Sequence, residues 1–170
     1  MAHKFRILIV DDEKTLCSVF KAGLLESGYD CETALNGKAA LELIKSESFD
    51  MMITDIIMPG MDGFELTEQV KKIKPDIIVI IMTGFQQEES YERAIALGAA
   101  DFIKKPFALN ELAMRIERVL RDAKILAEIR SKQQEVRETS REMIEGVQEE
   151  AFKRIQQLEE DIIDLRKKIS

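Results

Sequence analysis

The 170-residue chain has no tryptophan, one histidine, two cysteines and three prolines. Cys17 and Cys31 stand among apolar neighbours without the close spacing of a zinc or redox motif, which favours reduced core thiols and a cytoplasmic location. No apolar run reaches the length of a membrane span, and the run that follows residue 6 is too short for a signal peptide. These absences argue against a disulfide-rich, membrane-embedded or exported protein.

The charge balance is acidic, with a formal net charge of −7. Such a balance argues against a general nucleic-acid or membrane surface. Hydrophobic residues make up 45% of the chain, which is enough for a real core. The length predicts one sizeable domain plus an appendage.

Five short apolar runs alternate with five amphipathic stretches. The runs, each predicted to be a buried strand, cover residues 7–10, 29–34, 49–54, 77–81 and 99–104. The stretches predicted to be helices cover residues 14–27, 37–44, 64–73 and 88–97, and then continue from about residue 108. This alternation predicts an α/β fold with a parallel sheet and helices on both faces. Ligands of such sheets bind beyond the carboxyl ends of the strands.

Chemically active side chains follow four of the predicted strands. Asp11 and Asp12 follow the first, Asp55 the third, Thr83 the fourth and Lys105 the fifth. Considered without the other residues, Asp55 is also open to a plainer interpretation, as the first residue of a turn. Three carboxylates in one crevice repel one another and favour a cation, and oxygen ligands without His or Cys suit Mg²⁺. An ammonium and a hydroxyl beside them would stabilise a phosphoryl group arriving at one carboxylate.

These motifs resemble the receiver domain of bacterial two-component response regulators. The resemblance covers about residues 4–122 and rests on Asp11-Asp12, on residues 55–63 (Asp-Ile-Ile-Met-Pro-Gly-Met-Asp-Gly), on Met82-Thr83-Gly84 and on Lys105-Pro106-Phe107. The family implies the flavodoxin-like (βα)5 fold with strand order 2-1-3-4-5. The extent of the resemblance predicts two parts of the chain: a receiver domain, residues 4–122, and a helical coiled-coil extension or linker, residues 123–170.

The resemblance also implies roles for single residues. Asp55 accepts a phosphoryl group from a histidine kinase or phosphotransfer protein. Asp12, Asp55 and the main-chain carbonyl of Ile57 bind Mg²⁺, and Asp11 contributes largely through water. Asp62 we interpret as a helix cap. Beyond its own phosphorylation and dephosphorylation, the domain is not expected to be an enzyme.

The remaining implied roles concern the phosphoryl oxygens and the switch. Thr83 and Lys105 contact these oxygens, and the Lys105-Pro106 bond is a candidate cis peptide. Phe102 matches the aromatic switch position and is expected to turn inward on phosphorylation; the plainer alternative is a core residue. The surface built by residues 88–97, 99–104 and the following helix would then change.

The C-terminal segment beyond Ala108 contains no proline and a single glycine, Gly146, which predicts one long helix. Apolar residues recur at three-four spacing and weaken at Arg130, Gln133 and Arg137. The row comprises Val119, Ala123, Leu126, Ile144, Val147, Ala151, Ile155, Leu158, Ile162, Leu165 and Ile169. It predicts a parallel coiled-coil homodimer, a helix folded back on itself, or, in the plainest interpretation, a flexible linker. No basic helix-turn-helix is present, so direct nucleic-acid binding is not expected.

Two main functions follow from these features. The first is a phosphorelay switch whose output is protein association through the C-terminal helix. In the second, the chain is the regulatory front of a larger protein, with an enzymatic or DNA-binding output domain beyond Ser170; the mid-heptad end of the sequence favours this alternative. A phosphatase-like enzyme of similar fold is a weaker third.

Overall fold

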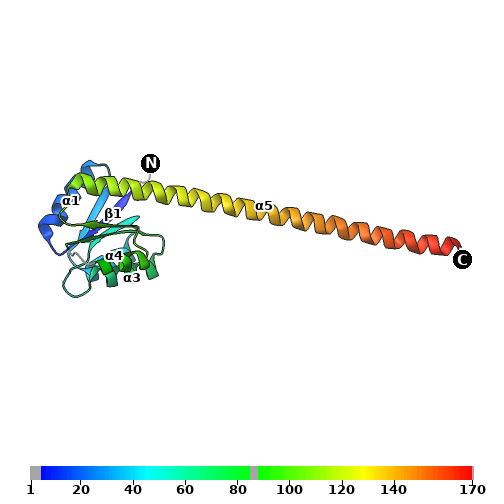
Figure 1. Cartoon of the computed structure of the whole chain (residues 1–170), viewed down its shortest axis with the longest axis horizontal. Coiled ribbons are helices and arrows are strands. Elements are labelled where there is room, and N and C mark those ends of the chain that lie inside the picture. Colours follow the sequence, from blue (N-terminus) through cyan, green and yellow to red (C-terminus); the bar gives the residue numbers. More distant parts are fainter. Residues whose placement is uncertain (1–4, 85–87, 170) are drawn as a thin grey trace. The chain divides into compact units, whose positions relative to one another are not determined.

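A computed structural model describes residues 5–84 and 88–169 (Figure 1). Contacts within the chain group it into two units, residues 1–120 and residues 121–170. The predicted start of the receiver domain, at residue 4, lies outside the described residues.

The first unit is built around a five-stranded parallel sheet in the order β2-β1-β3-β4-β5. The predicted α/β class and the 2-1-3-4-5 order are therefore confirmed. The strands are β1 Arg6–Val10, β2 Asp30–Ala34, β3 Met51–Asp55, β4 Ile78–Thr83 and β5 Asp101–Lys104. The helices are α1 Lys14–Glu26, α2 Gly37–Ser46, α3 Gly63–Ile73, α4 Glu88–Ala96 and α5 Leu109–Ile169.

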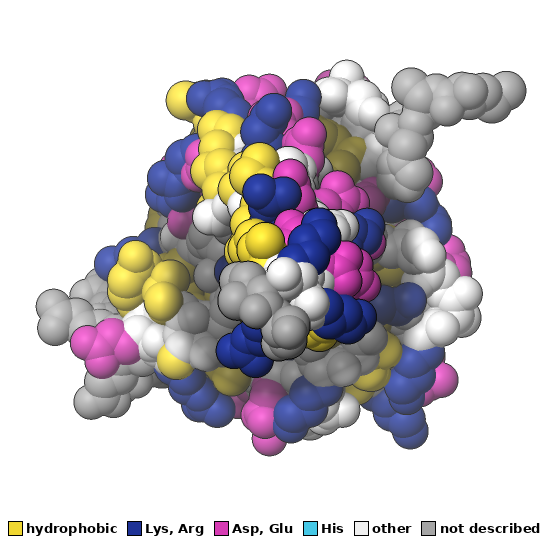
Figure 2. All heavy atoms as spheres, turned by 90° about the vertical axis from the view of Figure 1, so that its right-hand side faces the viewer, with side chains coloured by type: hydrophobic (Ala, Val, Ile, Leu, Met, Phe, Trp, Pro, Cys, Tyr) yellow, Lys and Arg dark blue, Asp and Glu magenta, His cyan; other side chains and the backbone are white. Residues whose placement is uncertain are grey.

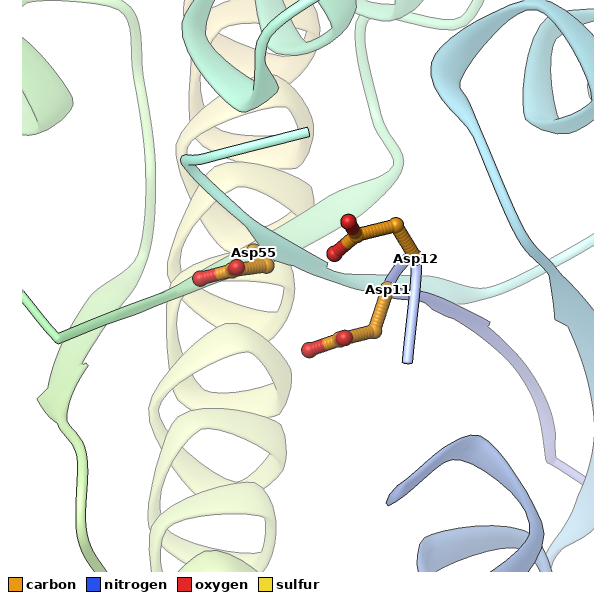
Figure 3. A group of neighbouring side chains, drawn as sticks. All are labelled: Asp11, Asp12 and Asp55. Atoms are coloured by element: carbon orange, nitrogen blue, oxygen red, sulfur yellow. The ribbon is translucent and has the colours of Figure 1, made fainter. Parts of the chain in front are cut away.

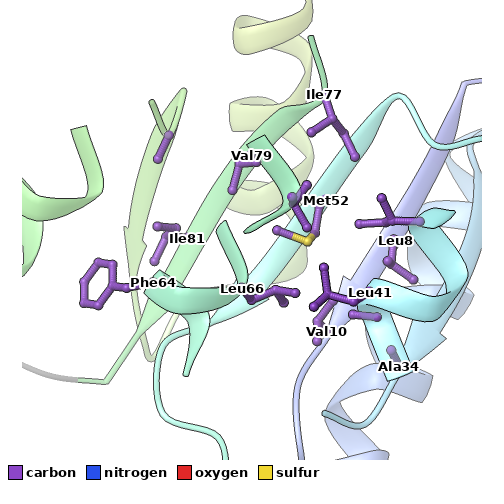
Figure 4. Packing of buried hydrophobic residues seen from close by; sticks show 14 of the residues in the cluster. Leu8, Val10, Ala34, Leu41, Met52, Phe64, Leu66, Ile77, Val79 and Ile81 are labelled. Carbon is purple, nitrogen blue, oxygen red and sulfur yellow. The ribbon is translucent and has the colours of Figure 1, made fainter. Parts of the chain in front are cut away.

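The sheet buries an apolar layer on each face, because alternate side chains of one strand point to opposite sides. On one face, strand residues such as Leu8, Met52 and Ile81 pack against α2, α3 and α4 (Figure 4). On the other, strand residues such as Ile9 and Ile53 pack against α1 and the first turns of α5. Every residue of β3 is buried, as expected of a strand covered on both faces.

Local signals explain where the helices begin and end. Asn36 caps α2 by accepting a hydrogen bond from the Ala39 amide. Asp62 caps α3 and forms a capping box with Glu65, which confirms the interpretation of Asp62 as a cap. Gly28 and Gly98 follow α1 and α4 with φ of 92° and 81°, a left-handed conformation that glycine adopts without strain.

The helix α5 runs without a break through Gly146, so it contains no turn at which it could fold back on itself. From residue 124 to residue 168 every side chain is exposed, including large apolar ones such as Ile129, Val136 and Ile155. Figure 2, which faces the C-terminal end of α5, shows hydrophobic side chains grouped beside charged ones on this surface. Within the described residues no helix is long and apolar enough to cross a membrane.

Candidate functional site

Three carboxylates gather at the carboxyl ends of β1 and β3. Asp11 and Asp12 follow β1 directly, and Asp55 is the last residue of β3. One carboxylate oxygen from each residue lies within 4.8 Å of the other two (Figure 3). Asp11 and Asp55 are only 1% and 7% exposed, whereas Asp12 is exposed to solvent. The parallel topology therefore brings together the three acids that were predicted to share one edge.

The carboxylate of Asp11 is held from two sides. Its Oδ1 accepts a hydrogen bond of 2.9 Å from the amide of Glu13, in the turn that leads into α1. Its Oδ2 accepts a hydrogen bond of 2.7 Å from Nζ of Lys105. Because both oxygens are engaged and the residue is buried, Asp11 forms a fixed wall of the site.

Asp55 is less completely satisfied than Asp11. Its Oδ2 lies 3.4 Å from Nζ of Lys105. Its Oδ1 is buried and has no hydrogen-bond partner among the described residues. Burial raises the pKa of Asp55, the ammonium of Lys105 opposes that rise, and the negative charge of Asp11 adds to it. Since orphaned buried oxygens are rare in folded proteins, this one marks a place for a ligand.

Lys105 supplies the positive charge of the site from the loop after β5. A cis peptide bond joins it to Pro106, as the resemblance implied. The next residue, Phe107, stacks on Phe20 of α1 with ring centroids 5.4 Å apart, which anchors the loop. Burial acts to lower the pKa of Lys105, but its hydrogen bond to Asp11 and the charges of Asp55 and Asp11 outweigh that effect. The pKa is therefore raised, and the ammonium stays protonated.

Thr83 is the last residue of β4 and is fully buried. In the pairing of β3 with β4, Asp55 lies opposite Met82, so Thr83 stands one residue beyond it at the same edge. The carbonyl of Thr83 accepts a hydrogen bond of 2.7 Å from the amide of Lys105. This bond ties the ends of β4 and β5 together and keeps both residues at the site.

The loop between β3 and α3 carries Ile57, whose side chain is 52% exposed. Its neighbour Ile56 is pinned on both sides. The Ile56 amide donates to the carbonyl of Met82 at 3.1 Å, and its own carbonyl accepts from the amide of Gly63 at 2.9 Å. The main chain around Ile57 is thereby held next to Asp55.

Phe102, the predicted switch residue, lies on β5 and is partly buried. Its ring meets the ring of Tyr91 on α4 edge to face, with centroids 5.9 Å apart. It therefore touches the surface formed by α4, and it also packs against the core on that face of the sheet.

Three features of the site were not found from the sequence. A Cβ added to Gly63 would lie 2.1 Å from the carbonyl oxygen of Asp55, so only glycine allows the helix to start there. The thiol of Cys17 donates to the carbonyl of Asp11 at 3.4 Å, and burial raises the pKa of Cys17 to about 11, which keeps it unreactive. The Tyr91–Phe102 contact is the third. Of these, only the Asp62-Gly63 pair at the start of a helix left a signal in the sequence.

The donor set fits a small, hard cation. Three carboxylates with oxygens within 4.8 Å, one of them carrying an orphaned buried oxygen, offer the ligands that Mg²⁺ prefers. Lys105 neutralises part of this charge through Asp11 and Asp55, while Asp12 is exposed to solvent. The site can therefore hold a divalent cation together with an anionic group.

A family model, curated relatives and solved structures all match this chain to one family. The family model described as the response regulator receiver domain matches residues 7–117, more than half of the chain. The chain is similar to the response regulator SaeR of Staphylococcus aureus, 38% identical over 114 residues, which are 67% of this chain and 50% of that protein. It thus spans about half the length of the curated relatives it matches.

Solved structures of receiver domains resemble the first unit. A CheY-like receiver domain protein from Methanospirillum hungatei JF-1 superposes with a TM-score of 0.69 at 32% identity, covering 72% of this chain and 98% of that chain. TrrA from Thermotoga maritima, in complex with Mg(2+)-BeF, superposes with a TM-score of 0.62 at 35% identity, covering 68% of this chain and 98% of that chain. Fold, site and family model agree, and the chain belongs to the response regulator receiver domain family.

Proposed function

We propose that this protein is a phosphorylation-controlled signalling switch in which Asp55 accepts a phosphoryl group from a histidine kinase or a phosphotransfer protein. The observation that carries the proposal is the buried, unpartnered Oδ1 of Asp55, set beside Asp11, Asp12 and Lys105. In the transfer, the bond between phosphorus and the donor atom breaks and a bond between phosphorus and an oxygen of Asp55 forms. Family membership supports this chemistry.

Asp12, Asp55 and the main-chain carbonyl of Ile57 would hold Mg²⁺, with Asp11 contributing through water. When bound, the ion neutralises charge on the phosphoryl oxygens. That TrrA, a relative of the same fold, was solved in complex with Mg(2+)-BeF supports a metal and a phosphoryl-like group side by side.

The chain's own residues orient and stabilise the incoming group. Asp11 holds the ammonium of Lys105 at 2.7 Å, while the same ammonium reaches Asp55 at 3.4 Å. Lys105 therefore stands ready to bind a phosphoryl oxygen as negative charge builds on Asp55. Thr83, at the adjacent strand end, would donate its hydroxyl to another phosphoryl oxygen.

A switch follows from these contacts. Phosphorylation replaces the single negative charge of the Asp55 carboxylate with about two negative charges on the phosphoryl group. Thr83 is drawn toward the phosphoryl group, and Phe102 turns inward into the space this leaves. Because Phe102 contacts Tyr91 of α4, the turn would change the surface formed by α4, β5 and α5.

The output we propose is association of two copies through the C-terminal half of α5, whose apolar side chains are exposed along its length. The protein would act in the cytoplasm, bind no nucleic acid directly and catalyse nothing beyond its own phosphorylation and dephosphorylation. The alternative, a regulatory front with a separate output domain, is supported by the chain's spanning about half of its curated relatives.

The test is intact mass after incubation with a small phosphodonor and Mg²⁺. The wild type should gain the mass of one phosphoryl group, and Asp55→Ala should gain none. Asp62→Ala is a matched control, because Asp62 is a carboxylate in the loop that follows Asp55 and caps α3; this variant should be modified like the wild type. Equal modification of wild type and Asp55→Ala would refute the proposal.

A further inference from the structure

The last turns of α5 present a regular apolar row. Its members Ile155, Leu158, Ile162 and Leu165 are between 47% and 57% exposed, and no described part of the chain covers them. Successive members are three, four and three residues apart, which is the heptad spacing of a coiled coil. A row of this kind requires an apolar partner.

The residue types of this row specify the kind of partner. In heptad letters the two isoleucines occupy a positions and the two leucines occupy d positions. A β-branched residue at a combined with leucine at d favours two parallel strands over three or four. The partner that offers the same row is a second copy of this chain.

The charged residues beside the row specify orientation and register. Arg154 and Asp161 occupy g positions, while Glu159 and Arg166 occupy e positions, and all four are exposed. In a parallel, in-register pair each g residue faces the e residue five positions later in the other helix. Arg154 then faces Glu159 of the second copy, and Asp161 faces Arg166 of the second copy. Both contacts join opposite charges.

An antiparallel pair would oppose like charges. In that arrangement g positions face g positions and e positions face e positions. Centred on the same row, it sets Asp161 against Asp161, Arg154 against Lys168 and Glu159 against Glu159. The flanking charges therefore disfavour the antiparallel arrangement at all three contacts.

Upstream of residue 155 the pattern is less specific. Ile144, Val147, Ala151 and Ile155 are spaced by three, four and four residues, an eleven-residue repeat that locally unwinds a coiled coil. Further back, Ile129, Val136 and Met143 form a second exposed row at spacing seven, one position before the polar Arg130 and Arg137. The segment 154–166 is therefore the part of this row that keeps an unbroken heptad spacing with complementary charges beside it.

We infer that residues 154–166 of α5 form a parallel, in-register two-stranded coiled coil with a second copy of the chain, aligned by ion pairs between Arg154 and Glu159 and between Asp161 and Arg166. This inference rests on the proposed association of two copies and adds its direction, register and recognition charges.

Disulfide trapping of the full-length chain tests the geometry. Leu158→Cys is placed in a glutathione redox buffer and examined on a non-reducing gel. A parallel, in-register pair brings the two introduced thiols together, so a covalent dimer should form. Glu160→Cys is the matched control on the far side of the helix and should stay monomeric on the gel. The wild type should not cross-link, since Cys17 and Cys31 are buried.

A mixture of Leu158→Cys and Ile162→Cys chains of different tag length separates the alternatives, because the antiparallel arrangement places position 158 of one copy against position 162 of the other. If neither variant cross-links alone but the mixture does, the pair is antiparallel and the inference is wrong. Light scattering reports separately on association itself. A monomer at micromolar concentration would refute the proposed dimer, whereas a dimer that resists Leu158→Cys trapping would refute only the parallel register.

Charge reversal tests the recognition step. Arg154→Glu should raise the dissociation constant of the dimer about tenfold, because it opposes carboxylates in two symmetric contacts. The double variant Arg154→Glu/Glu159→Arg should restore it. Positions 154 and 159 are five apart and do not face each other within one helix, so restoration reports a contact between copies. Unchanged affinity in Arg154→Glu, or loss without restoration, would contradict the ion pair.

Discussion

The sheet buries its apolar residues, whereas the distal part of α5 exposes them. Every residue of β3 is buried, and what β3 presents at its end is a carboxylate. From residue 124 to residue 168 of α5 no side chain is buried, and isoleucine, leucine and valine are exposed among the charged residues. A region that has satisfied its own apolar groups is free to place polar atoms for chemistry. A region that has not done so is suited to bind another chain.

The sharpest contrast between these regions is in two glycines. At Gly63 an added Cβ would meet the carbonyl oxygen of Asp55 at 2.1 Å, whereas at Gly146 it would meet nothing within 4 Å. Gly63→Ala should therefore cost about 3 kcal/mol of unfolding free energy, because backbone must move. Urea unfolding followed by the fluorescence of Tyr29 and Tyr91, both in the first unit, measures it.

Gly146→Ala should act in the opposite direction. Alanine is favoured over glycine inside a helix by about 1 kcal/mol, so thermal melting followed by circular dichroism should shift upward. Equal effects of the two substitutions would mean that the start of α3 does not pack against Asp55 as described.

The two regions should also be separable in function. Ile162→Lys places a charge at the centre of the proposed pairing surface in both copies, and should raise the dissociation constant about a hundredfold or more. Glu160→Lys, on the opposite side of the helix, should leave it nearly unchanged. Light scattering over a concentration series measures both.

Phosphoryl incorporation should be equal in Ile162→Lys and the wild type, because all residues of the site around Asp55 belong to the first unit. Loss of phosphoryl incorporation in Ile162→Lys would contradict this separation of roles between the two regions.

The smallest effect concerns the pH dependence of Asp55. Burial, the largest cause, raises its pKa; Lys105 opposes this and Asp11 adds to it. A carboxyl with a raised pKa in the folded state binds its proton more tightly there. Folding therefore loses stability as pH rises from the unfolded pKa, about 3.9, through the folded value.

Asp55→Asn removes this titration and should stabilise the metal-free protein by about 1 kcal/mol at pH 7, with the gain shrinking toward pH 4. Urea unfolding in a chelating buffer at both pH values measures it. Asp122→Asn, which changes an exposed acid outside the first unit, should have little effect at either pH. A loss of stability in Asp55→Asn at pH 7 would contradict the described burial.

Much of the fold followed from local patterns. Ile77–Ile81 is a continuous β-branched run, which is typical of a strand covered on both faces. The repeated alternation of strand and helix predicts a parallel sheet. The edge that carries Asp11, Asp55 and Lys105 could be predicted for the same reason, since parallel strands end on one side. Strand limits shifted by one or two residues, so that Asp55 and Thr83 close their strands instead of following them.

Contacts that depend on the packing of distant loops could not be predicted. That Lys105 lies nearer to Asp11 than to Asp55 depends on the path of the loop anchored by Phe107. The approach of Gly63 to the Asp55 carbonyl depends on the angle at which α3 enters. The second apolar row of α5 is hard to predict for another reason: Ile129 and Val136 lie one position before Arg130 and Arg137, out of phase with the main row.

The identity of the phosphorylated residue is the most direct test of the proposed switch. After incubation with a small phosphodonor and Mg²⁺, reduction with borohydride converts an acyl phosphate into a stable alcohol, which peptide mass spectrometry can locate. The account predicts reduction at Asp55 alone, dependent on Mg²⁺ and equally efficient in Ile162→Lys. Reduction at Asp11 or Asp12, or at Asp55 without any need for the ion, would contradict it.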